Sequence, residues 1–70
     1  MSAGLSVLIP VYNWDVRELV NSLTAQIIDW PGPVEIRLLD DNSTEEFRRL
    51  NRPLANQPNI IYQELPRNVD

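Results

Sequence analysis

The sequence predicts an α/β fold in which three strands alternate with two helices in the order β-α-β-α-β. Apolar, β-branched runs of strand length lie at residues 5–12, 34–39 and 60–65, and the two segments between them carry apolar residues at helical spacing. Strands that are separated by helices of this length pair in parallel through right-handed crossovers. The sequence therefore predicts half of a doubly wound, Rossmann-like sheet with three parallel strands.

The first strand and the first helix are predicted by pattern and by turn chemistry. Residues 5–12 lack clean alternation, as expected of a strand that is covered on both faces, and Pro10 suggests that strand pairing stops there. Asp15 followed by Glu18 has the pattern of an N-cap with a capping box. The apolar stripe of the helix that follows consists of Val16, Leu19, Val20, Leu23 and Ile27. A Trp-Pro-Gly-Pro run at residues 30–33 ends this helix.

The second strand leads into a similar unit. Ser43 and Glu46 repeat the capping-box pattern at the start of the second helix. The apolar stripe of this helix consists of Phe47, Leu50 and Leu54. Pro53 cannot lie in a regular helix interior, so we expect the helix to end or kink near Asn51. A turn then leads into the third strand.

Length and composition limit the classes of protein that fit. Seventy residues allow one small domain at most, and we interpret residues 1–70 as a single partial domain. The chain contains no cysteine and no histidine, which excludes disulfides, thiolate or imidazole metal ligands and a histidine general base. The net charge is −4, and an acidic chain without a basic stripe is a poor candidate for nucleic-acid binding.

The sequence also gives an expectation for the compartment. No apolar run approaches a membrane span of about 18 residues. The N-terminus lacks the basic region of a signal peptide, so we expect a cytoplasmic protein with no membrane segment in this chain.

The predicted fold places a ligand site beyond the carboxyl ends of the strands, where residues 10–13, 40–43 and 66–68 converge. The first strand is not followed by G-x-G-x-x-G, and no G-x-x-x-x-G-K-[ST] phosphate loop is present. The edge instead offers an aromatic ring beside a pair of carboxylates, which suits a nucleoside. Asp40 and Asp41 are adjacent and point to opposite faces, so we do not expect them to chelate one metal ion.

These segments resemble motifs of the family 2 glycosyltransferases of the GT-A fold. Residues 6–13 resemble the opening strand of the family, and residues 38–44 resemble its second strand with the Asp-Asp-x-Ser motif. Residues 59–62, with Arg67-Asn68 after them, resemble the third strand and the asparagine that follows it. The family usually continues with a glycine, where this sequence has Asp70. The three motifs stand in the family's order and at its spacing, and the resemblance covers nearly the whole chain.

The resemblance implies roles for individual residues. The donor-nucleotide pocket would be lined by Pro10, Val11, Tyr12 and Asn13. Asp41 would accept a hydrogen bond from the base, and Asp40 would support the loop or the ribose. Arg67 would be either a phosphate contact or a surface residue.

The resemblance also implies a reaction. The parent protein would transfer a sugar from a nucleotide-diphosphate donor to an acceptor hydroxyl, with inversion, in polysaccharide biosynthesis. The family's Asp-x-Asp, which holds a divalent metal (Mg²⁺ or Mn²⁺), and its general base lie on later strands. We therefore expect that residues 1–70 contain no catalytic residue, bind no metal and are inactive alone.

Other interpretations stay open for several residues. Tyr12 could be a partly buried aromatic residue at a strand end, and Asp41 could cap the second helix. Trp14 and Trp30 fit packing roles beside the first helix. A solvated helix face is the simplest interpretation of three arginines, namely Arg48, Arg49 and Arg52.

The alternative function is a non-catalytic α/β interaction module that associates with itself. With both helices on one face of the sheet, the other face and the edge of the first strand would be uncovered. The exposed apolar patch would consist of Val7, Ile9, Ile36, Leu38, Ile60 and Tyr62, or of their alternates one residue along. A response-regulator receiver fits poorly, because its acidic pair follows the first strand and it requires a lysine that this chain lacks.

Overall fold

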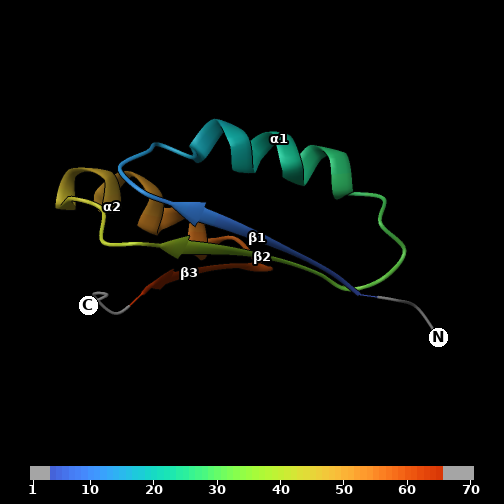
Figure 1. Ribbon diagram of the computed structural model, residues 1–70. Coiled ribbons are helices and arrows are strands. Elements are labelled where there is room, and N and C mark those ends of the chain that lie inside the picture. The colour runs from blue at the N-terminus through green and yellow to red at the C-terminus, as the bar shows by residue number, and fades with distance from the viewer. Residues whose placement is uncertain (1–3, 66–70) are drawn as a thin grey trace.

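The chain folds as the predicted alternation of strands and helices in a computed structural model that describes residues 4–65 (Figure 1). The elements in order are β1 (Leu5–Val11), α1 (Arg17–Ile27), β2 (Val34–Asp40), α2 (Glu45–Asn51), a 3₁₀ helix η1 (Arg52–Asn56) and β3 (Ile60–Glu64). The strands form one sheet in the order β1-β2-β3, and both neighbouring pairs are parallel. The predicted α/β class and strand order are confirmed.

Register and alternation decide which side of each strand is buried. Ile9 pairs with Leu38 across β1 and β2, and Ile36 pairs with Ile60 across β2 and β3. These four side chains share the face that the helices cover, and all are buried. The core they form is completed by Val11, Val16, Val20 and Leu54.

The opposite face of the sheet has no helix over it among residues 4–65, because both crossovers return on the same side (Figure 1). Leu8 is 60% exposed and Ile61 is 39% exposed on this open face. Arg37 and Glu35, on the central strand between them, form an ion pair with 2.8 Å between Nε and Oε1. The six residues named first for the predicted apolar patch therefore face the helices. The open face carries their neighbours one residue along each strand, the alternates in that prediction.

The helix starts differ from the predicted capping boxes. The N-cap of α1 is Val16 and that of α2 is Thr44, and neither has a side-chain capping hydrogen bond. Asp15 instead accepts hydrogen bonds from the main chain and the guanidinium of Arg17. Ser43 accepts a hydrogen bond from another turn. The predicted capping boxes are therefore wrong: Asp15 binds Arg17 two residues along, and Ser43 binds a residue that is distant in the sequence.

Two of the six prolines, Pro10 and Pro53, are predicted to interrupt an element, and they do so to different extents. Pairing of β1 with β2 continues through Pro10 to Val11, so the predicted stop at Pro10 is wrong by one residue. An edge strand tolerates proline because the missing N–H can lie on its unpaired side. Pro53 has the predicted effect, since α2 ends at Asn51 and the chain continues as η1.

One of the three arginines departs from the predicted solvated helix face. The two tryptophans are partly exposed, Trp14 by 60% and Trp30 by 42%, and their packing role beside α1 stays a prediction. Arg48 is not on a solvated face: only 21% of its side chain is exposed, and it lies between two carboxylates. No helix within residues 4–65 has the length and apolar character that crossing a membrane requires.

Candidate functional site

The turns that follow β1 and β2 are joined at the carboxyl ends of the strands, the end marked by the arrowheads in Figure 1. The main-chain N–H of Asp41 donates to the carbonyl of Val11 at 2.8 Å. The N–H of Asn13 donates to Ser43 Oγ at 2.8 Å, and the N–H of Thr44 donates to Asn13 Oδ1 at 2.8 Å. These three bonds, which we call the turn latch, fix one turn against the other.

The turn latch depends on an unusual backbone conformation that asparagine accepts. Asn13 has a φ of 47° and Asn42 has a φ of 64°, both in the left-handed region. Asparagine occupies this region more readily than most residues with a side chain. The Asn-containing turns in the sequence are therefore suited to the sharp bends at this edge.

Two of the predicted ligand contacts present their side chains to solvent at the latched edge. Tyr12 is 65% exposed, so it is not the partly buried aromatic residue of the simpler interpretation. Asp41 is exposed as well, and no capping hydrogen bond from its side chain exists at the start of α2. The site thus offers an aromatic ring and an exposed carboxylate from adjacent strands.

The remaining predicted site residues lie in different surroundings. Val11 is fully buried in the core, and its carbonyl is used by the turn latch, so it contributes main chain rather than side chain to this edge. Pro10 is exposed, and Asn13 is half-buried within the latch. Arg67 lies outside the described residues, as do the neighbouring Pro66 and Asn68.

Asp40 is fully buried beneath the edge. Its Oδ1 accepts a hydrogen bond from the N–H of Ser43 at 2.7 Å, and its Oδ2 accepts one from the Tyr62 hydroxyl at 2.5 Å. Burial and this hydrogen bond to Asp40 raise the pKa of Tyr62 well above its usual value. Asp40 is a structural support of the turn in this arrangement.

The described residues do not fit the divalent metal that the family resemblance implies. Within residues 4–65 no three acidic side chains gather closely enough to hold an ion. Asp40 has both oxygens committed to protein donors, and its neighbour Asp41 lies on the opposite side of the strand end. No chemical step is therefore assigned to a metal at these residues.

The roles of two residues near this edge are not evident from the sequence. The pattern predicts Ser43 as a helix cap, yet its hydroxyl accepts a hydrogen bond of the turn latch. Asn51, fully buried, accepts from the N–H of Val16 and donates to the carbonyl of Trp14, which ties α2 to the segment after the first turn. Asn51 could have been identified as a polar residue in the apolar part of a short helix. A polar side chain buried there needs hydrogen-bond partners, because burial without them is costly.

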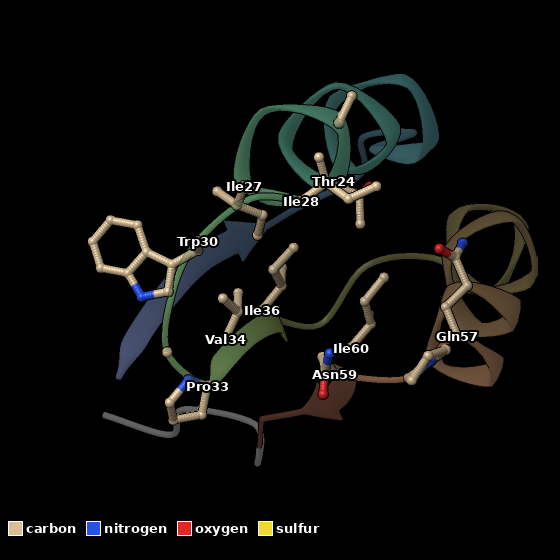
Figure 2. Close-up of a pocket in the computed structure, with 13 residues that line it drawn as sticks. Thr24, Ile27, Ile28, Trp30, Pro33, Val34, Ile36, Gln57, Asn59 and Ile60 are labelled. Atoms are coloured by element: carbon tan, nitrogen blue, oxygen red, sulfur yellow. The ribbon is translucent and has the colours of Figure 1, made fainter. Parts of the chain in front are cut away.

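A hollow of about 480 Å³ lies at the opposite end of the sheet, between α1, the start of β2 and the turn before β3 (Figure 2). Ile28, Ile36 and Ile60 are among the apolar side chains that line it, with the amides of Gln57 and Asn59 on one side. None of its lining residues is charged. This hollow has no carboxylate to accept a hydrogen bond from a base N–H, so it is a weaker candidate for a nucleotide site than the latched edge.

The chain thus folds as an open parallel α/β sheet, and its candidate site lies at the carboxyl ends of the strands, where sheets of this kind bind ligands. Residues 6–70 match the family model described as Glycosyl transferase family 2. Because the match covers nearly all of the chain, the chain belongs to this glycosyltransferase family. No match was found among the curated proteins or among the solved structures.

Proposed function

We propose that this chain binds the nucleotide of a nucleotide-diphosphate sugar, as the donor-binding part of a glycosyltransferase that transfers the sugar to an acceptor hydroxyl. One observation carries the proposal. The turn latch holds the exposed ring of Tyr12 and the exposed carboxylate of Asp41 at the same edge of the sheet.

The chemistry of these two groups suits a nucleobase. An ionised carboxylate only accepts hydrogen bonds, so Asp41 suits a base whose edge presents N–H donors. Uracil offers its imide N–H and guanine offers N1–H beside an amino group, whereas adenine and cytosine place an unprotonated ring nitrogen, an acceptor, beside their amino group. An aromatic ring such as that of Tyr12 can stack on the face of any base, which contributes affinity without selecting the base. The proposal therefore favours uridine or guanosine diphosphates.

The proposal is tested by following backbone amide signals in NMR while uridine, guanosine, cytidine and adenosine diphosphates are titrated in turn. We expect shifts at Tyr12, Asn13 and Asp41 with the uridine or guanosine compound, and none around the hollow at Asn59. Asp41→Asn should reduce binding, whereas Asp29→Asn, a change at an exposed carboxylate after α1, should not. If none of the four compounds shifts the amide signals of these residues, the proposal is wrong.

The transfer step belongs, in this proposal, to residues other than 4–65. The metal, Mg²⁺ or Mn²⁺, would assist departure of the diphosphate, and a general base would activate the acceptor hydroxyl. We therefore expect the purified 70-residue chain to turn over no nucleotide-sugar donor. Product formation above that of a Tyr12→Ala/Asp41→Ala control would contradict this expectation.

A second candidate function is a non-catalytic module that associates with itself through the open face of the sheet. The exposure of Leu8 and Ile61 on that face favours it. Complete absence of nucleotide binding, together with a molecular mass that rises with concentration, would support this function over the first.

A further inference from the structure

Asp40 connects the proposed base contact to the third strand. It directly precedes Asp41, and its two oxygens are bound from opposite directions. The N–H of Ser43 reaches Oδ1 at 2.7 Å from within the same turn, and the Tyr62 hydroxyl reaches Oδ2 at 2.5 Å from β3. A rotation of the Asp40 carboxylate would therefore break at least one of these bonds and loosen the turn that carries Asp41.

Arg48 has a different relation to the same carboxylate. Its Nε lies 3.9 Å from Asp40 Oδ1, beyond hydrogen-bond distance, and this Nε is buried without a hydrogen-bond partner. Its Nη1 lies 3.5 Å from Glu64 Oε1. Arg48 therefore balances the buried charge of Asp40 without fixing its direction, because Coulomb attraction at this distance depends weakly on orientation.

The orientation of the Asp40 carboxylate is therefore set by its two hydrogen bonds, from Ser43 and from Tyr62. The bond from Ser43 is internal to the turn, so it moves when the turn moves. The bond from Tyr62 is anchored in the sheet, since Tyr62 pairs with Leu38 in the parallel register of β2 and β3. Main-chain bonds also hold the backbone here, since the carbonyl of Asp40 accepts from the N–H of Leu65 at 2.8 Å. Of the two hydrogen bonds to the Asp40 carboxylate itself, that of Tyr62 is the one that comes from a neighbouring strand.

We infer that Tyr62 is a positioning residue for the nucleotide: its hydroxyl holds Asp40, Asp40 holds the turn at residues 41–43, and the turn directs the Asp41 carboxylate toward the base. This inference rests on the proposed nucleotide-binding function. It assigns no contact between Tyr62 and the ligand.

The test compares Tyr62→Phe with Ile60→Val. Both changes are on β3 and on its helix-covered face, but only the first removes a bond to Asp40. We expect Tyr62→Phe to weaken binding of the preferred nucleoside diphosphate by about fivefold, the size of a typical lost hydrogen bond, and Ile60→Val to leave it within about twofold. Titration calorimetry measures both. Equal affinities in the two variants would overturn the inference.

A second readout does not depend on the ligand. Hydrogen exchange of the Ser43 amide, which donates to Asp40, should become faster in Tyr62→Phe than in Ile60→Val when the two are compared at equal global stability. If the native chain binds no nucleotide, the proposed function fails and this exchange comparison alone decides whether Tyr62 positions the turn. Unchanged exchange at Ser43 in Tyr62→Phe would refute that role.

Arg48→Lys provides a further check should Tyr62→Phe not fold. This variant keeps a positive charge near Asp40 and leaves the bond from Tyr62 in place. Nucleotide affinity should stay within about twofold, because the inference gives Arg48 no orienting role. A loss of about fivefold or more in Arg48→Lys would transfer the positioning role from Tyr62 to Arg48 and overturn the inference.

Discussion

Asp40 and Asp41 are neighbours in the chain with different surroundings. Asp40 is fully buried and bound on both oxygens, whereas Asp41 is exposed beyond the strand end. The sequence could predict that the two carboxylates diverge, because successive strand residues point to opposite faces. It could not predict which one is buried, since that depends on where α2 and Tyr62 come to lie.

This difference predicts separable effects of two conservative changes. Asp41→Asn should weaken nucleotide binding by about tenfold to a hundredfold, the effect of losing a bond to a charged group, with little change in the free energy of unfolding. Asp40→Asn should weaken binding less and lower the free energy of unfolding by about 1–3 kcal/mol. Calorimetric titration and urea unfolding measure the two quantities. Equal or reversed effects on binding would remove Asp41 from its proposed role.

Tyr62 predicts a specific dependence of stability on alkaline pH. Burial and the bond to Asp40 raise the pKa of its hydroxyl in the folded chain, so the unfolded chain releases this proton at a lower pH. The stabilising contribution is fully present below a pH of about 10, the value for an unfolded tyrosine, and is lost as pH rises further. We expect the free energy of unfolding to decline in that range, and to decline less in Tyr62→Phe.

The composition of the chain allows the ionisation of Tyr62 to be followed with little interference from other side chains. The chain contains no cysteine, its six basic side chains are all arginines, and Tyr12 is the one other tyrosine. A Tyr12→Phe variant leaves Tyr62 as the sole phenol, whose ionisation can be followed by ultraviolet absorbance. Titration of that phenol in the folded chain at the pKa of free tyrosine would contradict the prediction.

At the scale of elements, Asn51 determines how the helices attach to the site. It is the last residue of α2, and it accepts from the N–H of Val16 and donates to the carbonyl of Trp14, both in the segment that leads into α1. Its side chain thereby fixes Val16, the N-cap residue of α1, to the end of α2. The partner lies far along the sequence, which explains why a local pattern could not identify it.

Replacing Asn51 with leucine should destabilise the chain strongly. The change leaves a buried donor and a buried acceptor unpaired, which costs about 2–4 kcal/mol of the free energy of unfolding. Asn51→Asp should cost less, because it retains an acceptor for the N–H of Val16. Asn21→Ala, a change at an exposed position of α1, serves as the control for both in urea unfolding. A cost for Asn51→Leu no larger than that of the control would show that these two bonds contribute nothing.

Element type and order were predictable from the sequence, and element ends were less so. The apolar runs and helical stripes identified all of the strands and both helices, and Pro53 correctly marked the end of α2. The errors concentrate where side chains of one turn bind another, as for Ser43 with Asn13. Such contacts depend on tertiary geometry, and local capping patterns do not include it.

At the scale of the whole molecule, the uncovered side of the sheet predicts self-association. The open face exposes Leu8 and Ile61 around the Glu35–Arg37 pair, and β1 has an unpaired edge. Apolar patches and bare edges recruit partners, and a second copy related by a two-fold axis could exchange the charges of this pair. We therefore expect a weak dimer at high micromolar concentration.

Sedimentation equilibrium of the native chain and two variants tests this prediction. Leu8→Glu should abolish the dimer by placing a charge on the open face. Ile28→Glu, a change at a residue that is 78% exposed on the other side of the molecule, should leave it intact. A folded native monomer at high micromolar concentration would defeat the prediction.

The parallel register also governs how fast the chain can fold. Leu5 pairs with Val34, and Ile36 pairs with Ile60. Each pairing between strands therefore requires closure of a long loop, whose entropic cost precedes the stabilisation by the contact. Two-state domains dominated by such distant pairings cross their folding barrier more slowly than helical domains of the same size. The bond from Asn13 to Ser43 spans a similar stretch of chain. The latched edge therefore has no local precursor in the unfolded ensemble, and it forms only together with the sheet.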